Sequence, residues 1–180
     1  MTVAPRAVEP GLFRHALGQF ATGVTVITTT TADGPVGATV SAFCSLSLDP
    51  PLVLACLGRD RSMHRALRSA PGFGVSILAS DQGPIARDFA RPADRFAGVG
   101  HSPGRYGAHL GGALAHLDCA VHEIRDGGDH VIVLGLVEAL QVHAGEPLLY
   151  AQGAFLDLPG PDWERAAASA PQEWLLSAPW

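Results

Sequence analysis

The sequence contains no lysine: all 12 of its basic residues are arginine, set against 17 acidic residues and a formal net charge of -5. No run of basic residues occurs, which argues against a nucleic-acid-binding surface. Long hydrophobic runs are missing too, because the longest apolar stretches, such as Val131–Val137, have only the length of a strand. The first residues carry one arginine and no apolar segment of a secretory signal. We therefore expect a cytoplasmic protein that binds neither nucleic acid nor membrane.

Cysteine is also scarce. Cys44, Cys56 and Cys119 are odd in number and lie in apolar, strand-like runs, which predicts buried free thiols rather than a disulfide. They form no CxxC pair, and no carboxylate cluster accompanies them, so we expect no metal site. What the chain has in quantity is apolar residues, 47% of 180 residues against 16% charged, which is typical of one compact domain.

The apolar residues from Pro10 to Gly23 recur at helical spacing and predict an amphipathic helix. Two further short helices are expected, one capped by Ser62 and running to Ala70, the other capped by Ser80 and Asp81 and running to about Ala90. Residues 92–112, rich in glycine and proline, are expected to form a loop.

Six or seven strands are expected, joined mainly by hairpins with turn signals such as Asp33-Gly34 and Gly127-Gly128. The predicted strands are Val24–Thr30, Val36–Phe43, Leu52–Leu57, Phe73–Leu78, Leu114–Ile124, Val131–Val142 and Leu148–Phe155. Since no βαβ alternation occurs, the fold predicted is mainly β, a split antiparallel β-barrel with short decorating helices. This domain is expected to span residues 1–158, followed by a tail over residues 159–180 that contains three tryptophans.

The most informative stretch is GATVSAFCSLSLDPPLVL, from Gly37 to Leu54. It starts as a strand, becomes rich in serine, and stops at Asp49-Pro50-Pro51, where the prolines restrict φ and remove N–H donors. We interpret it as a stiff corner between two strands, with small hydroxyl and backbone donors on its inner side. Such a corner suits a polar, planar ligand.

The next segment, from Cys56 to Ser62, ends a strand in arginines and starts a helix. Helix N-termini favour phosphate, and Arg59 and Ser62 would add charged and hydroxyl hydrogen bonds. A capping serine beside solvated arginines is an equally good interpretation of this segment taken by itself.

Seven segments of the chain, in order and at matching spacing, resemble the flavin reductase family, the FMN-binding split-barrel proteins that supply reduced flavin to two-component monooxygenases. They are FRHALGQFATGVTVITT (Phe13–Thr29), GATVSAFCSLSLDPPLVLACL (Gly37–Leu57), the stretch from Ser62 to Leu78, ARDFA, DRF, GDHVIVLGLV and PLLYAQGAF. The resemblance covers about residues 10–158. It implies a flavin-binding protein. Because a half-open barrel with exposed strand edges seldom stands alone, we also expect a symmetric homodimer with flavin near the interface.

The resemblance also implies the residues of a flavin site. Those that would line the flavin ring, its ribityl chain and its phosphate are Thr39, Val40, Ser41, Ala42, Ser45, Leu46, Cys56, Leu57, Arg59, Ser62, Phe89 and Arg95. At Ala42 the chain departs from the family, which usually has a polar residue in this loop, so the polar contacts and the choice between FMN and FAD stay open.

Two further residues are candidates for the reacting end. His130 starts a strand after a Gly-Gly turn, and the GDH motif implies a place near the nicotinamide or the reacting face of the flavin, so it is the candidate catalytic residue. Tyr150 in PLLY would contact the nicotinamide or the flavin edge, although a backbone-bonded aromatic of the barrel is equally probable. Of the other histidines, His64 follows the expected phosphate site, and the rest are expected to be exposed or locally bonded.

The function expected is NAD(P)H-dependent flavin reduction, with NADH or NADPH as co-substrate, FMN or FAD as acceptor, and a partner monooxygenase receiving the reduced flavin. Neither a nucleophile elbow nor a dinucleotide-binding glycine motif is present, which suits chemistry performed by the two bound cofactors. Two alternatives remain open: an FMN-dependent oxidase of the same barrel acting on another substrate, and a non-catalytic flavin-binding module.

Overall fold

A computed structural model describes residues 8–91 and 95–156, so the predicted tail over residues 159–180 lies outside the described part, and the boundary at residue 158 stays a prediction. The helices are α1 (Pro10–Leu17), α2 (Ser62–Leu67), α3 (Gly83–Ala90) and a 3₁₀ turn, η1 (Ser80–Gln82). The strands of the main sheet are β2 (Thr25–Thr31), β3 (Gly34–Val40), β4 (Phe43–Leu48), β5 (Pro51–Gly58), β6 (Gly72–Ile77), β9 (Ala115–Gly127) and β10 (His130–Val142). Five short strands are β1 (Thr22–Gly23), β7 (His101–Pro103), β8 (Ala108–Leu110), β11 (Leu149–Ala151) and β12 (Ala154–Leu156).

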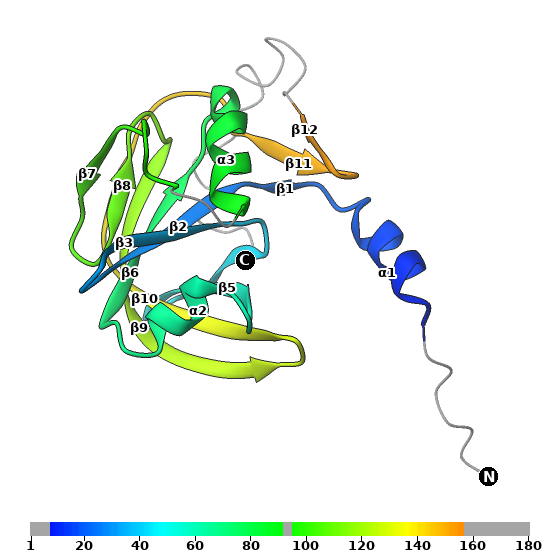
Figure 1. Ribbon diagram of the computed structural model, residues 1–180, viewed down its shortest axis with the longest axis horizontal. Coiled ribbons are helices and arrows are strands. Elements are labelled where there is room, and N and C mark those ends of the chain that lie inside the picture. The colour runs from blue at the N-terminus through cyan, green and yellow to red at the C-terminus, as the bar shows by residue number, and fades with distance from the viewer. Residues whose placement is uncertain (1–7, 92–94, 157–180) are drawn as a thin grey trace.

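The main sheet has the order β3-β2-β6-β9-β10-β5-β4, and all its pairings are antiparallel. It curls strongly, so that β3 at one edge comes round towards β5 near the other (Figure 1). At that end of the β4–β5 pairing, Cys56 N–H donates to the Ala42 carbonyl oxygen at 2.9 Å. The mainly-β, antiparallel prediction is confirmed.

Two buried clusters fill the fold. The larger lies inside the curl and includes Ile27, Met63, Leu67, Phe73 and Val133. The smaller joins α3 to the start of β2 through Val24, Val26, Leu78, Ala86 and Phe89. α2 and α3 therefore cover the curled sheet from one side and leave a gap between them (Figure 1).

The helices differ from the sequence predictions at their ends. α1 stops at Leu17, not Gly23, and the chain continues into β1. Arg61 holds the N-cap position of α2, so Ser62 is the first helical residue rather than the cap, and the helix ends at Leu67 rather than Ala70. The helix predicted after Ser80 splits into the 3₁₀ turn and α3, because Pro84 in the first turn of α3 favours a fresh helix start.

Two strand predictions and one loop prediction also differ from the structure. The predicted strand Val36–Phe43 ends at Val40, and a sharp turn at Ser41-Ala42 leads into the edge strand β4. The predicted loop over residues 92–112 contains the hairpin of β7 and β8. The last predicted strand is the hairpin of β11 and β12, turning at Gln152-Gly153, where both residues have positive φ.

The cysteines are free thiols, as expected, but only Cys119 is buried. Burial raises the pKa of the Cys119 thiol to about 12. Cys44 is exposed on the edge strand β4, because an edge strand turns part of its surface to solvent. Within the described ranges, no helix has the length and apolarity needed to cross a membrane.

Candidate functional site

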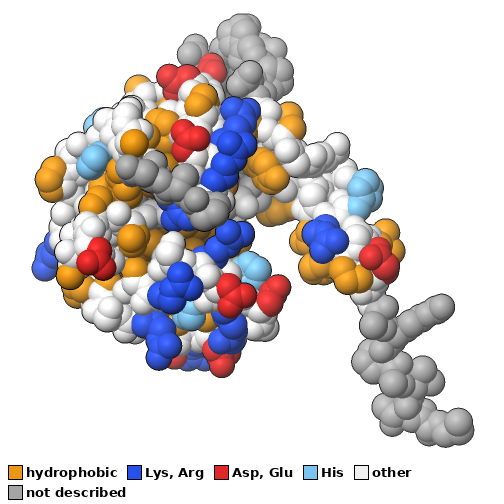
Figure 2. Space-filling model, viewed as in Figure 1, with side chains coloured by type: hydrophobic (Ala, Val, Ile, Leu, Met, Phe, Trp, Pro, Cys, Tyr) orange, Lys and Arg blue, Asp and Glu red, His pale blue; other side chains and the backbone are white. Residues whose placement is uncertain are grey.

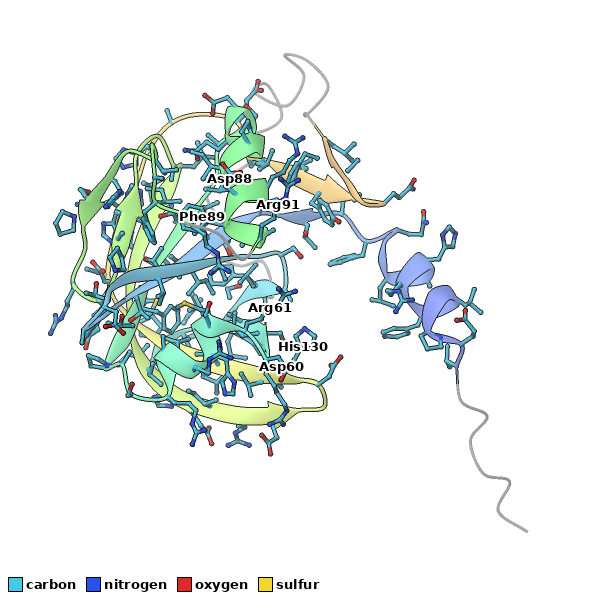
Figure 3. The ribbon with its side chains drawn as sticks, viewed as in Figure 1. Asp60, Arg61, Asp88, Phe89, Arg91 and His130 are labelled. Atoms are coloured by element: carbon cyan, nitrogen blue, oxygen red, sulfur yellow. The ribbon has the colours of Figure 1, made fainter. Side chains whose placement is uncertain are left out.

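A cavity of ≈ 470 Å³ opens between α2 and α3 where the sheet curls back on itself. One wall is the end of β3 and the following turn, Ala38–Ala42, and the other is the segment Cys56–Ser62. Figure 3 shows Asp60, Arg61 and His130 at one side of this opening and Phe89 on α3 at the other. The volume falls within the range of small-molecule and cofactor sites.

The cavity collects most of the residues that the sequence predicted for a flavin site. Eleven of the fourteen line it: Thr39, Val40, Ser41, Ala42, Cys56, Leu57, Arg59, Ser62, Phe89, Arg95 and His130. Ser45 and Leu46 do not line it, because the chain after Ser41-Ala42 continues as the outer edge strand β4, where both side chains are exposed. Tyr150 lines a neighbouring cavity.

The proline corner does not position the cavity walls in the way expected from the sequence. Asp49-Pro50 turns β4 into β5 at the Leu48–Pro51 end of their pairing, whereas the cavity lies at the Ala42–Cys56 end. What joins the two walls is the hydrogen bond from Cys56 N–H to the Ala42 carbonyl oxygen. Because this bond uses backbone atoms, the side chain of residue 42 has no part in it.

Gly37 and Thr39 of β3 hold α3 close to that strand at the edge of the cavity. A Cβ at Gly37 would lie 2.7 Å from Cε1 of Phe89, so only glycine lets that ring pack so close to the strand. Thr39 Oγ1 donates to the Ala86 carbonyl oxygen at 2.7 Å. The Thr39 hydroxyl therefore already supports the fold, and only its acceptor lone pairs remain for a ligand.

The arginines of the cavity fall into two kinds. Arg59 is tied to the hairpin of β9 and β10: its guanidinium lies 2.7 Å from a carboxylate oxygen of Asp126, and Nε donates to the Gly128 carbonyl oxygen at 2.7 Å. Arg61 and Arg95 form no ion pair with any of the residues that the structure describes. Burial, and then the charge of Arg61, lower the pKa of Arg95.

Arg95 is held in place by oxygen acceptors. Its guanidinium donates to the Gly37 carbonyl oxygen and, at 3.4 Å, to Ser62 Oγ, while Nε donates to the Arg91 carbonyl oxygen at 2.7 Å. Two neighbouring guanidinium groups repel each other, and an anion between them would relieve that repulsion. Sequence reasoning passed over Arg61, although it stands two residues from Arg59 in the same segment.

His130 lies on the exposed rim of the cavity. Its Nδ1 donates to a carboxylate oxygen of Asp129 at 2.7 Å, and this hydrogen bond is the main cause that lowers the pKa of Asp129. The β5–β10 pairing sets His130 opposite Gly58, which brings the GDH turn beside the arginine segment. His64 is instead bonded to the backbone of the arginine segment, because its Nδ1 donates to the Arg59 carbonyl oxygen at 2.8 Å.

Figure 2 shows arginine side chains gathered over α3 and around α2, on the face into which the cavity opens. The described ranges hold no grouping of three or more histidine, cysteine or acidic side chains that would bind a metal ion. The cavity thus combines a wall of small residues with Arg61 and Arg95, which form no ion pair among the described residues, and Asp60 and Asp129 also line it. Such a site suits a planar ligand that carries an anionic group.

The chain resembles known proteins over most of its length. It is 44% identical over 163 residues to an NADH-dependent FAD reductase of Streptomyces globisporus, covering 86% of this chain and 89% of that protein. It is 40% identical over 156 residues to the reductase subunit HsaB of a flavin-dependent monooxygenase from Rhodococcus jostii, covering 85% and 80%.

A solved structure of the Streptomyces globisporus NADH:FAD oxidoreductase SgcE6, in complex with NAD and FAD fragments, superposes with a TM-score of 0.81. That comparison has 40% sequence identity and covers 87% of this chain and 98% of the other. The family model described as "Flavin reductase like domain" matches residues 17–159. The chain therefore belongs to the flavin reductase family.

Proposed function

We propose that this protein is an NADH-dependent flavin reductase, in which flavin and nicotinamide bind side by side and the reduced flavin leaves for a monooxygenase. The observation that carries the proposal is the cavity lined by Arg61 and Arg95, which form no ion pair within the described residues, in a chain whose relatives include NADH-dependent flavin reductases. A reductase subunit of a monooxygenase among those relatives supports the partner. Three free thiols suit a reducing, cytoplasmic location.

We propose that the flavin phosphate binds Arg61, Arg95 and Ser62. The guanidinium fork forms short, charged hydrogen bonds to phosphate oxygens, and both cations line the same cavity, where the charge of Arg61 lowers the pKa of Arg95. Arg59 contributes less than the sequence predicted, because Asp126 and Gly128 already occupy its donors. The flavin ring would then lie along the Ala38–Ala42 wall.

The bound flavin supplies the hydride acceptor: two electrons and one proton move from nicotinamide C4 to flavin N5. The protein has to align the two rings and exclude water rather than provide an acid or a base. The Ala38–Ala42 wall presents small side chains and backbone groups, which let a ring approach closely. His130, hydrogen-bonded to Asp129, lines the cavity beside the Arg59–Ser62 segment, and its role as the catalytic residue stays a prediction.

The test is a steady-state assay of NADH oxidation with FAD, FMN and riboflavin as alternative acceptors. We expect turnover with all three and a KM about tenfold or more higher for riboflavin, which lacks the phosphate. Equal KM values for riboflavin and FMN would contradict the phosphate assignment. A yellow protein that oxidises another substrate but not NADH would favour the oxidase alternative, and no oxidation at all would favour the binding module.

We also propose a homodimer, on the evidence of α1. None of its residues is buried, its apolar side chains Leu12, Phe13 and Leu17 are 54–62% exposed, and the helix points away from the body (Figure 1). An eight-residue helix is marginal in water unless its apolar face packs on something. A second copy of the chain would cover this apolar face. Sedimentation tests this, and a dimeric native chain together with a monomeric Phe13→Glu variant would support the homodimer. A monomeric native chain with full activity would contradict it.

A further inference from the structure

The arginines are unevenly distributed along the chain. Residues 59–95, which carry α2 and α3, hold seven of the 12 arginines but only four of the 17 acidic residues, so this segment is positive although the whole chain has a net charge of -5. Three of the seven line the cavity between α2 and α3, as described above. Three more are exposed and do not line that cavity, and we call them the arginine rim: Arg65, Arg68 and Arg91.

Two rim arginines continue the positive charge of the cavity along α2. Arg65 and Arg68 follow the cavity residue Arg61 at spacings of four and seven residues, which places the three on one face of the helix. Arg65 Nη1 donates to the Asp60 carbonyl oxygen at 3.1 Å, so its charge is held beside a residue of the cavity lining. The positive face of α2 therefore begins at the cavity edge.

The third rim arginine lies on the other helix. Arg91 is the C-cap residue of α3, and its carbonyl oxygen accepts from Nε of the cavity residue Arg95 at 2.7 Å. Figure 3 shows Arg91 on the α3 side of the opening and Arg61 on the α2 side. The arginine rim therefore flanks the opening on both helices, where Figure 2 shows basic side chains gathered.

The fold does not neutralise this charge. The rim arginines form no ion pair with a residue of the described ranges. Like charges three and four residues apart weaken a helix, so the arginines of α2 do not stabilise it. The exposed Asp88 of α3 and the cavity residues Asp60 and Asp129 lie on the same elements or in the cavity, and they offset only part of the charge. A ligand explains such a rim better than the fold does.

We propose that the arginine rim attracts the phosphate-bearing flavin at long range and so sets how fast flavin enters the cavity. This inference rests on the proposed function, in which flavin enters and leaves in each turnover. A phosphate monoester such as FMN carries about 1.5 to 2 negative charges at pH 7, whereas riboflavin has no phosphate. Charge of one sign around a cleft raises the association rate of an oppositely charged ligand by about 10- to 1000-fold. Because the rim lies outside the cavity lining, it acts on association and not on dissociation.

The test is the double variant Arg65→Gln/Arg91→Gln, which removes one rim charge from each helix and keeps a side chain of good helix propensity. Stopped-flow fluorescence measures kon and koff for oxidised FMN in about 10 mM and about 1 M NaCl, where the Debye length is roughly 30 Å and 3 Å. At the lower salt concentration we expect kon of the variant to be about fivefold below the native value, with koff within about twofold. At the higher salt concentration both proteins should bind FMN at equal rates, and riboflavin should show no difference at either concentration.

The matched control is Arg14→Gln/Arg105→Gln, which removes the same charge from other parts of the molecule. Arg14 lies on α1, which points away from the body (Figure 1), and Arg105 pairs with Glu138 at 3.4 Å. The control's kon for FMN should stay within about twofold of the native value. An equal fall of kon in the control would overturn the inference, because the total charge and not the rim would then govern association.

The rim variant itself can also overturn the inference. If its kon at low salt equalled the native value, the rim would not attract flavin, and a faster koff at that unchanged kon would make these arginines contacts of the bound flavin instead. None of these measurements contains NADH. A native chain that binds FMN but oxidises no NADH would therefore contradict the proposed function, whereas the results above contradict this inference alone.

Discussion

Charged and polar side chains gather at two places: the cavity between α2 and α3, and a stack of the rings of His109, His116 and His143. In the stack these groups support the fold, whereas in the cavity they are available to a ligand. In the stack, the rings of His109 and His116 lie 4.7 Å apart and 5° from parallel, and His143 meets His116 edge-on at 5.5 Å. Asp118 accepts from His109 Nε2 at 3.2 Å and from Arg105 N–H at 2.9 Å. In the cavity, by contrast, Arg61 and Arg95 form no ion pair with any described residue, although Asp60 and Asp129 also line it.

The difference shows how to separate polar groups that support the fold from those that bind a ligand. In the stack each partly buried donor finds an acceptor within the chain; His116 Nε2, for example, donates to the Leu110 carbonyl oxygen at 2.8 Å. Burial of such groups costs free energy unless they are bonded, and here they are. In the cavity the guanidinium groups of Arg61 and Arg95 form no ion pair with a described residue, and their charges repel each other. Substitutions in the stack should therefore change stability, and substitutions in the cavity should change flavin affinity.

The largest effect is expected for Arg95→Met. The loss of a charged donor beside Ser62 and Arg61 should weaken FMN binding by 1.5–3 kcal/mol, about 10- to 100-fold in Kd. Fluorescence titration with FMN measures it. Riboflavin should bind the variant and the native chain about equally, because it has no phosphate to lose. A Kd for FMN within twofold of the native value would contradict the assignment of Arg95 to flavin binding. Arg95 would then support only the fold, as the groups of the histidine stack do.

The sequence was enough to predict the sheet and most of the cavity, because strand alternation and turn residues are local signals. Ser45 and Leu46 lie outside the cavity, since nothing local showed that the chain turns outward at Ser41-Ala42, and their contact with flavin stays a prediction. The contacts of Arg59 could not be predicted, because its partners, Asp126 and Gly128, are more than 60 residues away in the sequence. His109 and His116 were expected to be exposed or locally bonded, but they bond to Asp118 and Leu110 on other strands, and their stacking depends on the pairing of those strands.

The second effect is expected at Asp118, in the stack. Asp118→Ala leaves the Arg105 N–H and the His109 ring without their acceptor, which should lower the free energy of unfolding by about 1–3 kcal/mol. Urea unfolding measures the loss. FMN affinity of the folded variant should stay within twofold of the native value, and Asp126→Ala, whose carboxylate is exposed and tied to Arg59, is the control with a loss below about 1 kcal/mol. Weakened FMN binding by Asp118→Ala would show that the two regions are coupled.

The smallest effect is expected for the pH dependence that comes from His116. Burial lowers the pKa of His116, and the hydrogen bond to Leu110 only partly offsets this, while His109 and His143 lower it further and Asp118 raises it. The unfolded chain takes up this proton at about pH 6.5, before the folded chain does, so stability falls as the pH drops below about 6.5. The slope from one such group is at most about 1.4 kcal/mol per pH unit. His116→Gln, which keeps an amide donor for Leu110 and cannot titrate, should flatten the loss in unfolding free energy between pH 7 and pH 5.5. The exposed His122 gives the comparison, and an equal flattening by His122→Gln would mean that burial of His116 is not the cause.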